Sequence, residues 1–276
     1  MNELRRFLAA VQYFTRLPVP RWVGHSQTLL DDSVRYFPAV GLVVGAIGAA
    51  VLLGAAMLWS AGVSVVVSMI ATLVVTGAFH EDGLADAVDG LGGGLDRNRA
   101  LEIMKDSRIG AFGAIALGMV LLLKFVTLSS VPSLQAALLL LAGHAVSRLG
   151  AVFIMTKMPY ARESDDSRSK PLVQHVSMVS VVIATLTGIV ALPAMGWAGV
   201  SMRWTGVPMW WAGVPMWWAG VPMWWAGVPG LLAVGLVSFV WGLYLKRRLG
   251  GYTGDCLGAA QQLGECAFYL ACTAAY

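Results

Sequence analysis

The chain has 276 residues, of which 58% are hydrophobic and only 12% are charged, and its formal net charge is +4. Soluble domains are about one quarter charged, so this chain lacks the polar surface that a water-soluble globule needs. The composition excludes a soluble enzyme or a soluble nucleic-acid-binding protein. It predicts an all-α fold, a polytopic membrane helix bundle, built as a single domain over residues 1–276.

The first twenty residues predict an amphipathic helix that lies at the membrane interface, and not a cleaved signal peptide. Arg5 and Arg6 stand near its start, and Pro18 and Pro20 end it. Apolar residues recur at helical spacing along it, at Leu4, Phe7, Leu8, Val11 and Phe14.

Seven later segments are long and apolar enough, or nearly so, to cross a bilayer, which takes about 20 residues. The seventh is interrupted by Gln261, Gln262 and Glu265, so it is either a span or a helix packed against the bundle. We therefore expect about six or seven transmembrane helices. The segments are Phe37–Ser60, Ala61–Phe79, Ala111–Ser129, Ser133–Thr156, Met178–Val200, Val228–Leu245 and Leu257–Ala275.

The connections between these segments alternate in charge. The turns at residues 60–62 and 129–133 carry no charge, and residues 201–228 carry only Arg203, whereas the other connections hold clusters of Arg and Lys. The positive-inside rule places the charged side and the N-terminus in the cytoplasm, with the protein in the inner membrane.

Residues 206–226 repeat GVPMWWA three times without a change. Identity at every position indicates a recent tandem duplication, because structural repeats are longer and have diverged. Six tryptophans lie in this insert, and tryptophan favours membrane interfaces. We expect the insert to lie in an external loop and to have no catalytic role.

The densest acidic stretch is GAFHEDGLADAVDGLGGG, residues 77–94. Asp82, Asp86 and Asp89 stand at i, i+4 and i+7, which puts three carboxylates on one face of a helix. Such a stripe persists at low cost when a cation neutralises it or when some groups are protonated. Oxygen ligands at a membrane boundary suit Mg²⁺ or Mn²⁺. We take these residues as metal ligands; the alternative is an acidic face that is only solvated.

Basic and polar side chains follow in LEIMKDSRIGAFG, residues 101–113. Lys105 and Arg108 are candidates for binding phosphate oxygens, and Ser107 offers a hydroxyl. Asp106 is either a further ligand or the residue that orients Arg108. Ordinary positive-inside anchoring explains the two cations equally well.

Three ionisable residues fall inside the third and fourth predicted spans. Because a charge there is costly, we expect Arg148 to face the bundle interior, paired with an acid of the acidic stretch or with a substrate phosphate. His144, one turn before it, is expected to be a hydrogen-bonded core residue. Lys124 is expected to extend outward to the interface.

The C-terminal stretch GGYTGDCLGAAQQLGE, residues 250–265, adds a fourth acid. Asp255 follows a glycine-rich turn and begins a helix, a position from which its carboxylate is aimed back at the site. Glu265 is about 15 Å further along the helix and serves packing or a hydrogen bond. The three cysteines lack the spacing of a zinc site or a disulfide framework and are expected to be apolar helix residues.

Together these segments resemble the cobalamin synthase family, also called adenosylcobinamide-GDP ribazoletransferase. The resemblance covers nearly the whole chain, and its order and spacing make it specific; only the GVPMWWA insert departs from it. The matching pieces are YFTRLPVP at 13–20, YFPAVGLVVG at 36–45, the acidic stretch at 77–94, ALEIMKDSRIGAFG at 100–113, SR at 147–148 and GYTGDCLGAAQQLGE at 251–265.

The resemblance implies a late step of cobalamin biosynthesis. Adenosylcobinamide-GDP and α-ribazole, or α-ribazole 5′-phosphate, are joined with Mg²⁺ to give adenosylcobalamin or its 5′-phosphate, and GMP is released. The partners are then these substrates and the lipid bilayer, with a homo-oligomer or an association with other assembly enzymes left open. Catalytic candidates are Asp82, Asp86, Asp89 and Asp255, the first three also as metal ligands, and substrate-binding candidates are Lys105, Asp106, Ser107, Arg108 and Arg148.

Two other functions remain open from the residues alone. The stretch DGLADAVDGLGGG partly matches the pattern of CDP-alcohol phosphotransferases, but Asp86 stands where that pattern has Arg. A transporter is favoured less, because transporters show internal symmetry and ionisable groups near the membrane midplane, whereas these acids gather at the boundary.

Overall fold

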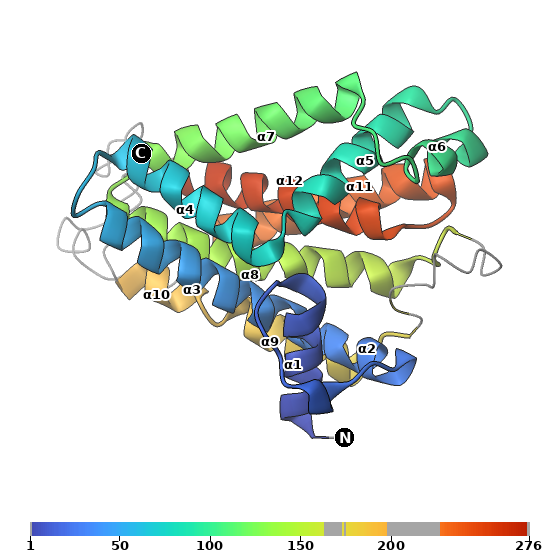
Figure 1. The fold of residues 1–276 in the computed structure, drawn as a ribbon, viewed down its shortest axis with the longest axis horizontal. Coiled ribbons are helices and arrows are strands. Elements are labelled where there is room, and N and C mark those ends of the chain that lie inside the picture. Colours follow the sequence, from blue (N-terminus) through green and yellow to red (C-terminus); the bar gives the residue numbers. More distant parts are fainter. Residues whose placement is uncertain (1, 163–172, 174, 198–226, 275–276) are drawn as a thin grey trace, which may run out of the picture.

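The computed structural model is an elongated bundle of helices (Figure 1). It describes residues 2–162, 173, 175–197 and 227–274. Within this part of the chain every regular element is helical, apart from one isolated bridge between Tyr160 and Tyr252. The all-α prediction is therefore confirmed. The GVPMWWA insert lies outside the described residues.

The N-terminal helix forms where its periodicity predicts it and lies to one side of the bundle (Figure 1). α1 (Glu3–Phe14) is capped by Asn2, whose side chain accepts a hydrogen bond from the Leu4 amide. An ion pair of 2.9 Å between Arg6 and Asp32 holds α1 against the short elements that follow. These are η1 (Arg21–Val23), α2 (Gln27–Ser33) and η2 (Val34–Tyr36).

Four helices of the described residues are long and apolar enough to cross a membrane. The first is the end of a helical run from Gln27 to Ala55. About 78% of the apolar window of the third is buried, against 28% and 22% for the second and fourth, so the third is central and those two are left to contact lipid. The four are α3 (Phe37–Ala55), α7 (Ala111–Ser129), α8 (Ser133–Lys157) and α11 (Val228–Leu249).

The other predicted spans are helical but differ from the expectation of six or seven full crossings. α9 (Met178–Ile189) is apolar but only 12 residues long, and α10 (Leu192–Trp197) follows it after a break. α12 (Gly254–Thr273) is too polar to count as a span by composition and is mostly buried among the other helices. Of the two alternatives that the sequence left open for this segment, the structure therefore supports a helix packed against the bundle.

The second predicted span breaks before its end. α4 (Ala61–Thr76) and α5 (Phe79–Gly93) together would make a fifth crossing, but they bend by 86°. Gly77 and Ala78 both adopt the left-handed region, with φ of 66° and 56°. A left-handed alanine costs about 1–2 kcal/mol, so tertiary contacts must hold this break. It turns α5 toward the short helix α6 (Arg97–Ile103).

Small residues allow the central helices to approach closely. A Cβ at Gly41 of α3 would overlap the backbone of α8 at His144, and one at Gly45 would lie 2.7 Å from the Leu140 carbonyl oxygen. Helices in a membrane associate through this kind of close contact because lipid gives them no hydrophobic drive to pair. These two glycines therefore let α3 pack directly against the backbone of α8.

Candidate active site

The three acids of α5 lie on one face, as their spacing predicts, but they differ in burial. Asp82 is exposed, Asp86 is half-buried and Asp89 is only 8% exposed. The charges of Asp82, Asp89 and Asp255 all act on Asp86, and Arg162 is the cation that opposes them. The structure therefore brings the four predicted acids into one electrostatic cluster at the α5 end of the bundle.

Both carboxylate oxygens of Asp89 are engaged by the backbone at the start of α7. The Gly110 amide donates to Oδ2 at 2.7 Å, and the Gly113 amide donates to Oδ1 at 2.8 Å. A Cβ at either glycine would overlap this carboxylate, so the contact requires glycine at both positions. A carboxylate at a helix N-terminus satisfies amides that the helix itself leaves unpaired. Asp89 thus ties α5 to the loop that precedes α7.

Asp255 lies in the first turn of α12, where Thr253 caps the helix by accepting from the Cys256 amide. Its Oδ2 accepts from Nη2 of Arg162 at 2.7 Å. Gly83 and Gly258 let α5 and α12 touch, since a Cβ at Gly83 would lie 3.2 Å from the Asp255 Cα. This places Asp255 beside the acidic face of α5, as its position after the glycine-rich turn predicts.

The loop before α7 carries the predicted phosphate-binding residues, and Lys105, Ser107 and Arg108 are exposed. The Arg108 guanidinium donates to both oxygens of Asp106, from Nε to Oδ1 at 3.0 Å and from Nη2 to Oδ2 at 2.6 Å. These hydrogen bonds lower the pKa of Asp106 to about 2. Asp106 thus lies where it can orient Arg108, which is one of the two roles predicted for it.

The arrangement of the acids bears on what metal they suit. Among the described residues, no group of three or more His, Cys, Asp or Glu side chains converges closely enough to hold a metal ion by itself. Mg²⁺ typically takes only one or two carboxylates and fills its other positions with water and substrate phosphates. Asp82 and Asp86, one helical turn apart, fit that requirement, whereas the oxygens of Asp89 are already bonded to amides.

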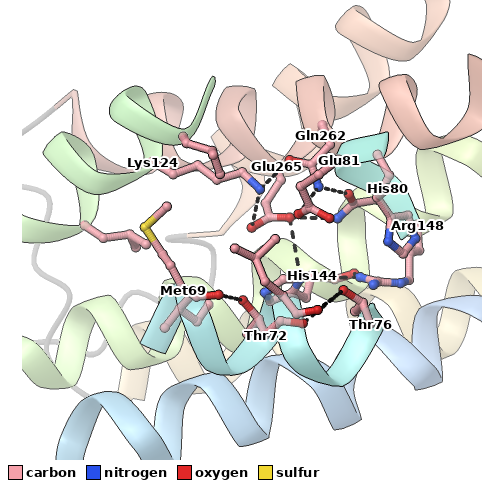
Figure 2. Close-up of a pocket in the computed structure, with 15 residues that line it drawn as sticks. Met69, Thr72, Thr76, His80, Glu81, Lys124, His144, Arg148, Gln262 and Glu265 are labelled. Atoms are coloured by element: carbon pink, nitrogen blue, oxygen red, sulfur yellow. Dashed lines mark hydrogen bonds and ion pairs between the residues drawn. The ribbon is translucent and has the colours of Figure 1, made fainter. Parts of the chain in front are cut away.

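A second polar cluster lies inside the bundle (Figure 2). Arg148 is 2% exposed and donates from Nη1 to the His144 carbonyl oxygen at 2.8 Å, so it faces the interior as expected. His144 is buried with Nδ1 3.5 Å from a Glu265 oxygen, which agrees with a core histidine. Glu81 is the one acid of α5 that lines this cluster. Asp82, Asp86, Asp89 and Asp255 do not line it.

The expectation for Lys124 is wrong. Its side chain does not extend to the interface but is 5% exposed inside the bundle, where Nζ donates to Oε1 of Gln262 at 2.7 Å. Nζ also lies 3.2 Å from Oε1 of Glu265. A buried ammonium persists when a carboxylate and further hydrogen bonds compensate it, and α12 supplies both.

Glu265 is the centre of this cluster, which we call the Glu265 network. Its carboxylate accepts from the Tyr269 hydroxyl and from Nε2 of Gln261, both at 2.7 Å. Nε2 of Gln262 in turn donates to Oε1 of Glu81 at 2.8 Å. The network thereby reaches the first turn of α5, one residue before Asp82.

Sequence reasoning missed three residues of these clusters. In the sequence, Glu81 is only one more acid of the acidic stretch, and Gln262 is only an interruption of an apolar segment. The i, i+4 spacing of Gln261 and Glu265 in an otherwise apolar helix was a usable signal for a buried polar face. Arg162 had no such signal, because its pairing with Asp255 joins positions 93 residues apart.

Comparisons with known proteins agree with the motifs. A family model described as cobalamin-5-phosphate synthase matches residues 6–273. A protein from Leptothrix cholodnii named adenosylcobinamide-GDP ribazoletransferase is 43% identical over 98% of this chain and 95% of its own length. Proteins of the same name from Vibrio cholerae and Ralstonia pickettii are 40% and 44% identical over 97% and 96% of the chain, and over 93% and 95% of their own lengths. No solved structure matches.

Proposed function

This chain belongs to the cobalamin-5-phosphate synthase family, and we propose that it is a membrane-bound adenosylcobinamide-GDP ribazoletransferase. It joins adenosylcobinamide-GDP to α-ribazole or α-ribazole 5′-phosphate and releases GMP, a late step of cobalamin biosynthesis. The observation that carries this proposal is the similarity of named ribazoletransferases to 96–98% of the chain. The family model, which matches residues 6–273, takes in every motif of the site.

The reaction is a substitution at the β-phosphorus of a pyrophosphate. A bond forms between the ribazole hydroxyl oxygen and phosphorus, the bond to the GMP oxygen breaks, and the hydroxyl proton passes to a base. The charge of the pyrophosphate must be balanced throughout. The reaction therefore needs cationic groups at the pyrophosphate and a base at the hydroxyl. The acids of α5, as candidate metal ligands and base, and the cations of the loop before α7 are suited to these two needs.

We assign Mg²⁺ to Asp82 and Asp86, where it would neutralise pyrophosphate charge and act as a Lewis acid. Asp86, half-buried among the other acids, is the candidate to accept the hydroxyl proton. Asp89 is a poorer candidate for either role, because two backbone amides occupy its oxygens.

The exposed cations of the loop before α7 are assigned to the phosphates. Arg108 is held by Asp106 in a defined orientation, and an exposed guanidinium can bind phosphate oxygens in pairs. Lys105 and Ser107 lie on the same loop, which Asp89 fastens to the acidic helix. Arg148 is buried in the Glu265 network, so a contact between Arg148 and substrate needs an opening of the bundle.

We also propose that this end of the bundle faces the cytoplasm from the inner membrane. Arg248 donates to the Leu91 and Gly94 carbonyl oxygens, and Arg97 donates to those of Ala161 and Leu249. These bonds gather basic residues around the end of α5. The opposite turns, at residues 56–60 and 130–132, carry no charge. The positive-inside rule then supports a cytoplasmic site.

The proposal is tested with purified protein in lipid nanodiscs, given adenosylcobinamide-GDP, α-ribazole and Mg²⁺, with GMP measured by chromatography. We expect release that needs both substrates, stops with EDTA and returns with added Mg²⁺. CDP-diacylglycerol in place of the donor should yield no CMP, which separates this reaction from a CDP-alcohol transfer. Folded protein that releases no GMP with either α-ribazole or its phosphate would contradict the proposal.

A further inference from the structure

A small cavity lies within the Glu265 network, between α4, α5, α7, α8 and α12 (Figure 2). Its volume is ≈ 20 Å³, counted as the space open to the centre of a water molecule. One water needs about 10–15 Å³ on that measure, so the cavity admits about one or two. It is too small for a phosphate or a nucleotide. The residues that line it include Thr72, Thr76, Glu81, His144, Arg148 and Glu265.

Three polar atoms of the residues that line the cavity have no hydrogen-bond partner among the described residues. They are Oε2 of Glu81, Nε2 of His144 and Nε of Arg148. The His144 and Arg148 side chains are more than nine-tenths buried. Leaving a buried polar group unpaired costs about 1–3 kcal/mol, and more when the group is charged. Three such atoms, all on residues that line one cavity, therefore point to a small polar ligand that bonds them.

The charges around the cavity favour a neutral ligand. Lys124 and Arg148 supply two cations, and Glu81 and Glu265 supply two carboxylates. An added metal cation would face both cations, and an added anion would face both carboxylates. The ligand must also donate to a carboxylate and accept from a guanidinium, because Glu81 offers only an acceptor and Arg148 only a donor. Water meets both demands.

We propose that this cavity is an internal water site, in which one or two water molecules bridge Glu81 of α5 to His144 and Arg148 of α8. Gln262 already bonds the other oxygen of Glu81. With water on Oε2, the carboxylate is fixed from both sides, and the first turn of α5 is tied to the central helix. The site does not depend on the reaction proposed above, and either can stand without the other.

The test is X-ray radiolytic labelling of the protein in nanodiscs, read by mass spectrometry. Hydroxyl radicals formed from an internal water label the side chains beside it, although bulk radicals do not reach them. His144 is the reporter, His25 is the exposed control, and Met104, which is buried away from the cavity, is the protected control. We expect His144 to be labelled and Met104 to be spared, even though methionine reacts faster than histidine.

Two matched variants test whether the label comes from this water. One fills the cavity without changing Glu81, His144 or Arg148, and the other is its control. Thr76→Leu extends an apolar side chain into the cavity, whereas Thr127→Leu makes the same change at a threonine that is equally buried, at 7% exposure, but does not line it. We expect His144 labelling to be lost in Thr76→Leu and kept in Thr127→Leu. If His144 in the wild-type protein is as little labelled as Met104, the proposal is overturned, whether or not the variants fold. Labelling of His144 that persists in Thr76→Leu would also overturn it.

Discussion

Asp82, Asp86 and Asp89 share a helix face, yet their oxygens meet different surroundings. Asp82 is exposed, Asp86 lies among other acids, and Asp89 is bonded to two amides of α7. Helical spacing places all three on one stripe, but it cannot show which carboxylate a distant backbone has already engaged. We therefore assign Asp82 and Asp86 to the chemistry and Asp89 to the position of the loop before α7.

This division predicts the behaviour of Asp89 variants. Asp89→Ala leaves the Gly110 and Gly113 amides unpaired, so the free energy of unfolding should fall by about 1–3 kcal/mol. Asp89→Asn keeps one acceptor oxygen and should lose less. Denaturation in detergent measures both. Asp82→Asn, at an exposed position, is the control and should change stability by less than about 0.5 kcal/mol. An Asp89→Ala protein as stable as the wild type would refute the anchoring role.

Arg108 gives a prediction on substrate binding. Its side chain is exposed and oriented by Asp106, so Arg108→Ala should leave the fold intact but remove a charge-assisted hydrogen bond to phosphate. The KM for adenosylcobinamide-GDP should then rise about tenfold or more in steady-state assays. Arg99→Ala removes another exposed, ion-paired arginine from nearby α6 and should leave KM unchanged. Equal KM values for the two variants would argue against a role for Arg108.

At the scale of elements, α12 combines a surface role with a buried one. Its first turn carries Asp255 beside α5, and its middle carries the acceptors that hold Lys124 inside the bundle. The polar residues in the middle of α12 lower its mean hydropathy below that of a membrane span. They are nevertheless buried, because they bond to polar side chains on other helices. Its interior position is consistent with helices α7 and α11 taking the lipid contact.

The ion pair between Lys124 and Glu265 predicts strong destabilisation when only one partner is removed. Lys124→Met leaves a buried carboxylate without its lysine, which should cost about 3–5 kcal/mol of unfolding free energy. Adding Glu265→Gln should restore part of that loss, and a double-mutant cycle measures the coupling. Lys157→Met, at an exposed lysine that ends α8, is the control. If the Lys124→Met protein is no less stable than the Lys157→Met control, Lys124 and Glu265 do not form a compensated ion pair.

The elements were largely predictable, and their breaks were not. Apolar runs gave the positions of α3, α7 and α8 within a few residues, because burial in lipid demands continuous apolar helix. The bend after Thr76 was missed, since it depends on Ala78 in a left-handed conformation that alanine rarely adopts. The inward turn of Lys124 was missed because hydropathy along one helix says nothing about acceptors on another.

At the scale of the whole molecule, the two ends of the bundle differ in chemistry. The end that carries the acidic face also holds Arg97 and Arg248, which bond to backbone carbonyls of α5, α11 and the segments that follow α5 and α8. At the other end, the turns that the structure describes, at residues 56–60 and 130–132, are uncharged, and apolar side chains such as Met57 and Leu58 are exposed. Motifs in the sequence predict most residues of the candidate site. Their pairings, such as Arg162 with Asp255, depend on how the helices assemble and could not be predicted from the motifs.

This polarity predicts the orientation in the membrane. The described native cysteines are buried, so a cysteine introduced at an exposed position reports its own accessibility. In intact cells, Ser130→Cys in the turn between α7 and α8 should react with a membrane-impermeant maleimide. Arg99→Cys in α6 should react only after permeabilisation. The reverse pattern would place the acidic face outside and contradict the cytoplasmic assignment.

The central claim is that the acidic face of α5 carries out ribazole transfer. The most direct measurement is GMP release by the Asp82→Asn protein in nanodiscs, with both substrates and saturating Mg²⁺, beside wild type and Glu102→Gln. The latter changes an exposed acid of nearby α6. We predict that Asp82→Asn inserts and folds normally but releases no GMP, while Glu102→Gln keeps wild-type turnover. Near-normal turnover by Asp82→Asn would contradict the claim.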